Sequence, residues 1–352
     1  MAKTASNDLQ VADELREIVR QIKSELCKSI VGQDRVIDDI LTVMFARGHC
    51  LLVGVPGLAK TLLIRSLAAC LDLQFRRIQF TPDLMPSDIT GTELIQQDPQ
   101  TGDRELRFHR GPIFGNIILA DEINRTPPKT QAALLEAMQE MQVTASGTAR
   151  KLPEPFFVLA TQNPIEQQGT YPLPEAQLDR FMFSIVLDYP SEAEELEIAQ
   201  RKPNDVSDEV ARVISVDQIQ SVCDLVPYVP IAPHIAKYAV RLCRYSRPED
   251  PNSPDFVKQY VTWGAGPRAS QSLVLAAKAR ALLKGEPYVD IDDIKSVAPS
   301  ILRHRVRTNF SAQSDGISQA DLIKKLMDAV SGIENEKSGE SIAKIFRPAS
   351  HR

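Results

Sequence analysis

The chain has 352 residues, 43% of them hydrophobic, and its 41 Lys and Arg against 46 Asp and Glu give a net charge of −5. This length predicts about two domains, each with its own hydrophobic core. The charge lacks the basic excess of a dedicated nucleic-acid-binding protein, although a local basic surface is not excluded.

The cysteines and the N-terminus bear on the compartment. The five cysteines are odd in number and show no C-x-x-C spacing, so disulfide frameworks and zinc sites are not expected. The polar, acidic N-terminus does not resemble a signal peptide, and no apolar run approaches the roughly 20 residues that cross a bilayer. These features predict a cytoplasmic protein without a membrane span.

The first elements in chain order are helices followed by a strand. Residues 11–30 and 34–45 carry apolar side chains at helical spacing. The second stretch leads into the apolar run 50–53, a glycine-rich turn and the helical stretch 61–71. Strand, glycine turn and helix in this order are typical of the start of a nucleotide-binding α/β unit.

Further strands are expected at 75–80, 116–120 and 156–160, with a helix at 129–141 between the last two. Strands that alternate with helices predict a parallel sheet covered on both faces. Turn-rich pieces interrupt this pattern and predict two inserted hairpins, one pairing 92–95 with 105–109 and one over 143–152.

After Pro190 the pattern changes from strands to helices. Helices are expected at 191–201, 216–226, 234–245, 268–284 and 290–297. The predicted organisation is an N-terminal helical segment (1–29), an α/β core with inserted hairpins (30–190), a helical domain (191–334) and a mobile tail (335–352).

The segment 54–61, GVPGLAKT, nearly fits the phosphate-loop pattern G-x-x-x-x-G-K-[ST]. Its glycines permit a tight turn whose backbone N–H groups face phosphate oxygens at the start of a helix. Lys60 would neutralise the β- and γ-phosphates, and the Thr61 hydroxyl would ligate Mg²⁺. Ala59 replaces a glycine of the pattern, and its methyl group is acceptable if the residue has helical backbone angles. The alternative is a strand-to-helix turn that merely contains Gly-Pro-Gly.

The apolar strand 116–120 ends in Asp121 and Glu122, the arrangement of a Walker B motif. Asp121 would hold Mg²⁺ through water, and Glu122 would orient and deprotonate the attacking water. A strand that ends in Asp-Glu can also cap a following helix, but the phosphate loop upstream favours the Walker B interpretation. Glu122 favours water attack, and hence an NTPase over a small-molecule kinase.

Together, several motifs resemble the MoxR family of AAA+ ATPases over about residues 30–307. They are GVPGLAKT (54–61), GPIF (111–114), DEINR (121–125), TQNP (161–164) and LDRF (178–181). The resemblance extends to Ala59, which looks like the family's own version of the phosphate loop. It implies a P-loop NTPase (AAA+) fold, in which a parallel-sheet core is followed by a C-terminal helical lid, with ATP and Mg²⁺ as cofactors.

The resemblance also assigns roles to single residues. Asn163 matches the sensor 1 position, where a neutral amide contacts the γ-phosphate and the lytic water; an ordinary Asn-Pro turn is the alternative. Arg180 matches the arginine finger, worth about 10³–10⁵ in rate; a local pair with Asp179 is the alternative. Arg268 matches sensor 2, acting in its own or a neighbouring subunit, or it only makes salt bridges at a helix start.

The expected site comprises three sets of residues. The catalytic set is Lys60, Glu122, Asn163, Arg180 and Arg268. The metal ligands are Thr61 and Asp121. The nucleotide-binding set is Val31, Gly32, Gly54, Val55, Pro56, Gly57, Leu58, Ala59, Lys60, Thr61 and Leu62, of which the first two resemble the AAA+ segment that packs on adenine.

The resemblance further implies a homo-oligomeric ring, usually a hexamer, that remodels or activates partner proteins, often ones with a von Willebrand factor A domain. The inserted hairpins would face the ring pore or a client, where Arg125 and His109 act or merely face solvent. A nucleic-acid-dependent AAA+ motor, a switch or scaffold with little turnover, and a magnesium-chelatase-type ATPase remain alternatives. The net charge of −5 makes nucleic acid the less favoured partner. For the basic run 303–307, a solvated helix end or a subunit contact is favoured over a phosphate or nucleic-acid contact.

Overall fold

The structure is a computed structural model that describes residues 2–97, 104–145, 147–165, 169–201 and 210–331. The chain divides into two compact units. Unit 1 contains Met1–Pro230 and Lys278–Tyr288, and unit 2 contains Ile231–Ala277 and Val289–Arg352. The predicted tail at 335–352 lies outside the described residues, and the predicted domain boundaries stay predictions.

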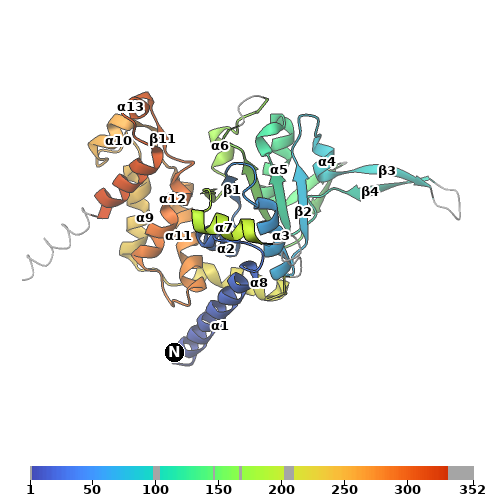
Figure 1. Cartoon of the computed structure of the whole chain (residues 1–352), viewed down its shortest axis with the longest axis horizontal. Helices are drawn as coiled ribbons and strands as arrows, with labels where there is room; N and C mark the ends of the chain where they lie inside the picture. Colours follow the sequence, from blue (N-terminus) through green and yellow to red (C-terminus); the bar gives the residue numbers. More distant parts are fainter. Residues whose placement is uncertain (1, 98–103, 146, 166–168, 202–209, 332–352) are drawn as a thin grey trace, which may run out of the picture. The chain divides into compact units, whose positions relative to one another are not determined.

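Unit 1 is built on a five-stranded sheet in the order β2-β5-β8-β1-β9, in which every neighbouring pair is parallel (Figure 1). The strands are β1 (Cys50–Val53), β2 (Phe75–Gln79), β5 (Ile117–Asp121), β8 (Phe157–Gln162) and β9 (Phe183–Val186). Consecutive residues of β5 and β8 point to opposite faces and are buried, so both faces of the central sheet are covered. This confirms the expected parallel α/β fold.

Helices surround this sheet in unit 1. They are α1 (Ala2–Leu26), α2 (Asp34–Phe45), α3 (Lys60–Cys70), α4 (Pro86–Thr90), α5 (Pro128–Glu140), α6 (Glu175–Leu178), α7 (Glu192–Gln200) and α8 (Val216–Leu225), with 3-10 turns at Ile123–Arg125 and Val226–Tyr228. The apolar face of α5 packs on one face of the sheet, where Leu134 and Met138 share a core cluster with Ile118 and Val158. This packing fixes the ends of β5 and β8 relative to each other.

Two antiparallel hairpins are inserted into unit 1, as the sequence predicts. The first joins β3 (Gly91–Gln97) and β4 (Arg104–Arg110) and extends away from the sheet (Figure 1). The second joins β6 (Gln142–Ala145) and β7 (Thr148–Lys151). Leu94, Ile95 and Leu106 on the first hairpin are 52%, 69% and 68% exposed, so this hairpin has no apolar core of its own.

Unit 2 is mainly helical. Its helices include α9 (Pro233–Tyr245), α10 (Asp255–Tyr260), the first part of α11 (Pro267–Leu283), α12 (Ile291–Leu302) and α13 (Phe310–Ser314), and residues 319–331 are also helical. Buried residues of α9 and α12, such as Leu242 and Val297, form part of its core. This agrees with the expected helical lid.

The structure corrects the expected strands in two places. The expectation that strands stop after Pro190 is wrong, because β10 (Val261–Trp263) pairs antiparallel with β11 (Arg307–Thr308). Segments this short contain too few residues to show a two-residue alternation. The sequence reading also misses β9, which pairs with β1 at one edge of the sheet. Within the described residues, no helix combines the length and apolarity needed to cross a membrane.

Candidate functional site

The phosphate-loop segment connects β1 to α3, as expected, and its backbone is turned by left-handed residues. Gly57 has φ 90°, and Ala59, the residue before α3, has φ 51°. The expectation that Ala59 has right-handed helical backbone angles is therefore wrong. The residue is left-handed, a conformation in which the Cβ atom causes steric strain. The first N–H groups of α3 have no partner within the helix and lie at the positive end of its dipole, which suits phosphate oxygens.

Lys60 is the cation of this loop. Its Nζ donates a hydrogen bond to the Gly54 carbonyl oxygen at 2.6 Å, so the side chain folds back over the loop. Partial burial lowers the pKa of Lys60, while the nearby carboxylates of Asp121 and Glu122 oppose that shift. A polyphosphate anion at this position would add charge neutralisation for Lys60 and is therefore a well-matched ligand.

A cleft of about 460 Å³ brings the predicted residues together. It is lined by Pro56, Gly57, Leu58, Ala59, Lys60, Thr61, Leu62, Asp121, Glu122, Thr161 and Asn163. Gly54 and Val55 belong to the same loop but do not line the cleft. A Cβ on Gly54 would lie 3.0 Å from the Leu187 Cβ. Any larger residue at position 54 would therefore have to displace Leu187 slightly.

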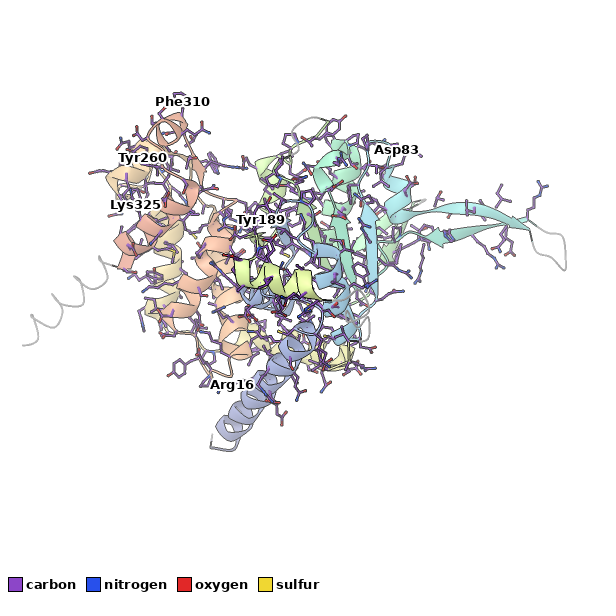
Figure 2. All side chains as sticks on the ribbon, viewed as in Figure 1. Arg16, Asp83, Tyr189, Tyr260, Phe310 and Lys325 are labelled. Carbon is purple, nitrogen blue, oxygen red and sulfur yellow. The ribbon has the colours of Figure 1, made fainter. Side chains whose placement is uncertain are left out.

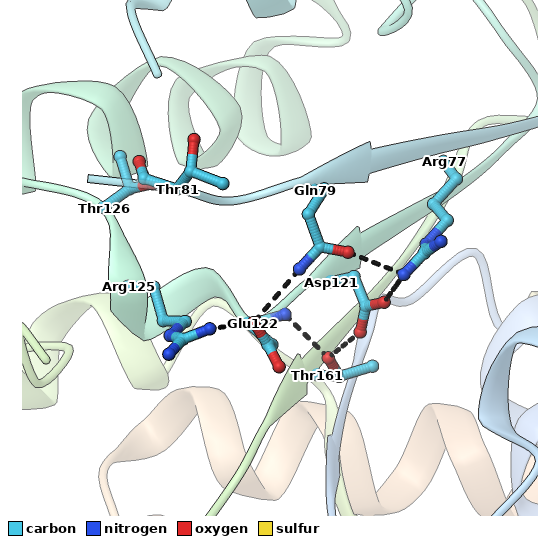
Figure 3. Close-up of polar contacts among 8 residues, drawn as sticks. All are labelled: Arg77, Gln79, Thr81, Asp121, Glu122, Arg125, Thr126 and Thr161. Atoms are coloured by element: carbon cyan, nitrogen blue, oxygen red, sulfur yellow. Dashed lines mark hydrogen bonds and ion pairs between the residues drawn. The ribbon is translucent and has the colours of Figure 1, made fainter. Parts of the chain in front are cut away.

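Asp121 lies at the carboxyl edge of the sheet, where parallel strands end together. Its Oδ1 accepts a hydrogen bond from Thr161 Oγ1 at 2.6 Å (Figure 3). Its Oδ2 accepts from Arg77 Nη2 at 2.6 Å, which forms an ion pair. The pairing of Gln79 with Asp121 and of Ala120 with Ala160 in the sheet places β2 and β8 on either side of this carboxylate.

Glu122 follows in the left-handed conformation, with φ 57°. Its backbone N–H donates to Thr161 Oγ1 at 2.8 Å. Its Oε2 accepts from Gln79 Nε2 and from Arg125 Nη1, each at 3.0 Å (Figure 3). Arg125, which the sequence leaves between a pore contact and solvent, therefore pairs with the predicted catalytic carboxylate. The carboxylate is held on two sides.

Asn163 is 7% exposed and lines the same cleft. Its Oδ1 accepts a hydrogen bond from the Ile165 N–H at 3.1 Å, so the Asn-Pro turn that the sequence offers as an alternative is also present. The turn leaves the Nδ2 amine of Asn163 as its remaining donor group. The residue thus combines a local turn with a position facing Asp121, Glu122 and the phosphate loop.

The other predicted residues lie outside this cleft. Arg180 follows α6, is half-buried, and pairs with no carboxylate in the described parts of the chain, Asp179 included. Arg268 is the exposed second residue of α11 and belongs to unit 2. Val31 and Gly32 precede α2, with Gly32 at φ 66°. The next residue, Gln33, donates from Nε2 to the Leu58 carbonyl at 3.4 Å and so connects this segment to the phosphate loop.

The basic run 303–307 is not the solvated helix end that the sequence favours. His304 and Arg305 are 6% and 5% exposed, and Arg305 Nη1 donates to the Ile301 carbonyl at 2.8 Å. The middle of the run is part of the interior of unit 2, whereas Arg303 and Arg307 stay partly exposed.

Thr161, Gln79 and Arg77 complete the polar network, and sequence reasoning assigned none of them a role. Thr161 stands in the TQNP motif, two residues before Asn163, and its hydroxyl bridges Asp121 and Glu122. Arg77 and Gln79 are two positions apart on β2, which puts both side chains on the same face of the strand. The missing information was that β2 and β8 both neighbour β5.

Thr61 and Asp121, the residues expected to hold Mg²⁺, both line the cleft, which also contains the side-chain oxygen atoms of Glu122, Thr161 and Asn163. In the described part of the chain, no three His, Cys, Asp or Glu side chains cluster as a metal site. Mg²⁺ in nucleotide sites is commonly bound through one or two carboxylates together with substrate phosphates and water. One hydroxyl and one carboxylate beside a phosphate loop fit that pattern.

Comparison with known proteins agrees with this geometry. Residues 49–183 match the model of the ATPase family associated with various cellular activities (AAA), and residues 255–326 match the AAA lid domain. The chain is 42% identical to chaperone MoxR1 of Mycobacterium tuberculosis over 91% of this chain and 83% of that protein. The chain belongs to the MoxR family of AAA+ ATPases.

Other similarities support this membership of the MoxR family. The protein MoxR of Methylorubrum extorquens is 30% identical over 90% of this chain and 94% of its own length. A protein of Cytophaga hutchinsonii with a known crystal structure is 41% identical, with a TM-score of 0.84 over 93% of this chain and 97% of that chain. This MoxR-family member is an AAA+ ATPase, and the reaction of that family is ATP hydrolysis.

Proposed function

We propose that this MoxR-family ATPase works as a ring of identical subunits that uses Mg²⁺-dependent ATP hydrolysis to remodel or activate partner proteins. The observation that carries the catalytic part is the convergence of Lys60, Asp121, Glu122 and Asn163 on one cleft of about 460 Å³. They come from three separate strand ends, so their meeting is a property of the fold rather than of one local motif.

In this proposal the phosphate loop and Lys60 hold the phosphates, and Thr61 and Asp121 hold Mg²⁺. The metal, when bound, neutralises charge on the phosphates. Glu122 accepts a proton from the attacking water, while the Asn163 amide orients that water. Val31 and Gly32 pack on adenine.

The proposed assembly gives roles to the remaining cations. Arg180, which has no carboxylate partner among the described residues, reaches the nucleotide of a neighbouring subunit as the arginine finger. Arg268 reports the nucleotide state to the lid. The core spans 30–190 and the lid 191–334. The name of the relative chaperone MoxR1 supports a chaperone-like action, and a partner with a von Willebrand factor A domain fits the family pattern.

Hydrolysis tests the catalytic part. We expect steady-state turnover to fall about 10²–10⁴-fold in both Lys60→Ala and Glu122→Gln. Glu122→Gln should still bind ATP, because the phosphate loop is unchanged. Glu140→Gln, an exposed carboxamide substitution at the end of α5, is the matched control and should keep full turnover. Normal hydrolysis by Lys60→Ala and Glu122→Gln would contradict the proposed mechanism.

Mass measurement tests the assembly. Glu122→Gln with ATP should form a closed ring, and affinity capture with this variant should retain the partner protein. Arg180→Ala should lower turnover in the ring without weakening ATP binding to one subunit. A chain that stays monomeric with ATP would leave Arg180 without its target, and stimulation of turnover by DNA in a salt-sensitive manner would favour a nucleic-acid motor instead.

A further inference from the structure

A second cleft lies in unit 1, formed by three helices. It has a volume of about 470 Å³, and we call it the basic cleft. Its lining residues are Arg16, Val19, Arg20 and Lys23 of α1, Asp38, Leu41 and Thr42 of α2, and Arg280, Leu283, Lys284 and Glu286 in and after α11. Within each helix the lining residues follow an i, i+3, i+4 pattern, so each helix turns a single face toward the cleft.

The charge of this lining is unusual for an acidic chain. Five cations face two carboxylates, Asp38 and Glu286. Asp38 pairs with Lys23 at 2.6 Å, and Glu286 lies 3.9 Å from Lys284. Arg20 also pairs with Glu17, which lies outside the lining, at 2.7 Å. The five cations therefore exceed the carboxylates around them by two in a protein whose net charge is −5. Holding so many cations together costs free energy through mutual repulsion, and an anion in the cleft removes that cost.

The rim and the floor of the basic cleft differ in chemistry. Arg16 is an exposed residue of α1 at the rim of the cleft (Figure 2). The floor takes one buried apolar residue from each helix, Val19, Leu41 and Leu283. Cations above an apolar floor suit a ligand with a polyanionic part and a flat apolar part, because guanidinium groups pair with phosphate oxygens and an aromatic ring covers the floor.

We propose that the basic cleft is a second nucleotide-binding site, which takes a nucleoside polyphosphate independently of the phosphate loop. Its volume is close to that of the phosphate-loop cleft, about 470 Å³ against about 460 Å³. The two clefts share no lining residue. Two of the three helices, α1 and α2, lie before residue 49, where the match to the AAA family model begins.

Calorimetric titration of the full-length chain tests this inference. In Lys60→Ala, which weakens the phosphate loop, ADP should still bind once per chain, and tripolyphosphate should compete with it. The double variant Arg16→Glu/Arg20→Glu in the same background should weaken ADP binding by about tenfold or more for each cation removed. Adenosine, which lacks phosphates, should not compete measurably.

Controls separate the basic cleft from the phosphate loop and from folding. Arg16→Glu/Arg20→Glu with Lys60 intact should keep its ATPase turnover and its circular dichroism spectrum. Lys28→Glu reverses an exposed charge just beyond α1 and outside the cleft, and it should leave ADP binding unchanged. The inference is overturned if Lys60→Ala binds neither ADP nor tripolyphosphate, if charge reversal leaves its ADP affinity unchanged, or if only an acidic peptide such as polyglutamate binds.

Discussion

The carboxyl edge of the parallel sheet and the β3–β4 hairpin differ in how their side chains are placed. At the sheet edge, the carboxylates of Asp121 and Glu122 accept hydrogen bonds from four neighbouring side chains, those of Arg77, Gln79, Arg125 and Thr161. On the hairpin, apolar side chains such as Ile95 and Leu106 pair across the strands and remain exposed. The first region fixes its geometry with its own contacts, whereas the second leaves its apolar side chains exposed.

The difference follows from what covers each sheet. A two-stranded hairpin alone is marginally stable in water, whereas strands buried on both faces are held by packing. Substitutions should therefore be costly near the five-stranded sheet and nearly neutral for stability on the hairpin. Four measurements of the free energy of unfolding test this contrast, from the largest expected effect to the smallest.

His49 should make the sheet region sensitive to acid. Its Nδ1 accepts from the Val158 N–H and its Nε2 lies 3.2 Å from the Met138 carbonyl oxygen, so the neutral ring connects β8 to α5. Burial lowers the pKa of His49 to about 4. On acidification, His49 is protonated in the unfolded chain before it is protonated in the folded one. Its contribution to the free energy of unfolding is therefore complete above about pH 6.5 and falls by about 3 kcal/mol as the pH falls to 4.

Urea unfolding at pH 7 and at pH 4.5 measures this loss. His49→Gln keeps a donor and an acceptor but does not titrate in this range. Its free energy of unfolding should fall less on acidification than that of the unchanged chain. Equal falls in the two proteins would show that His49 does not carry the acid sensitivity.

Thr161→Val should lower the free energy of unfolding by about 2 kcal/mol, because it leaves the partly buried Glu122 N–H without its acceptor and removes the hydrogen bond to Asp121. ATP turnover should fall with it, since both carboxylates lose a fixed neighbour. Thr161→Ser keeps the hydroxyl and should restore most of the turnover. If valine and serine have the same effect, the hydroxyl does not hold the carboxylates.

Ala59→Gly should raise the free energy of unfolding by about 1 kcal/mol, since a left-handed backbone strains any residue with a Cβ. Chemical denaturation at pH 7 measures the gain. Ala69→Gly, at an exposed position in the last turn of α3, is the control and should lower stability slightly instead, because glycine has a lower helix propensity than alanine. A loss of stability in Ala59→Gly would contradict the strain.

Serine at Leu94, Ile95 or Leu106 should change the free energy of unfolding by less than about 0.5 kcal/mol, as expected for exposed positions. Basal ATP turnover should also stay unchanged, whereas stimulation by a partner protein should be lost. A large destabilisation would show that the hairpin has internal packing. Full stimulation in all three variants would contradict the expectation that this hairpin faces a client protein.

Local sequence patterns predicted those parts of the site that are formed by residues close together in the chain. The run 50–53, the glycine turn and the helix after it lie within one short segment, so the phosphate loop was recognisable. Asp121 and Glu122 were recognisable because they follow an apolar strand. The corrected elements, β10 and β11, are too short for a period and exist because they pair across the chain.

The rest of the site depends on which strands are neighbours. Gln79 and Thr161 reach Glu122 because β2 and β8 flank β5, and the order of strands in a sheet is set by packing over long sequence distances. His49 stood before a predicted strand, but its ties to Met138 and Val158 depend on α5 and β8 lying beside it. The roles proposed for Asn163, Arg180 and Arg268 stay predictions.

The Arg77 guanidinium has a consequence for how this sequence can change. Its Nη2 donates both to Asp121 Oδ2 and to Gln79 Oε1, and Gln79 in turn donates to Glu122. One exposed arginine of β2 thus contacts Asp121 directly and is connected to Glu122 through Gln79. Substitutions at 77 and 79 should therefore be non-additive, and an evolving lineage would be expected to exchange the two positions as a pair.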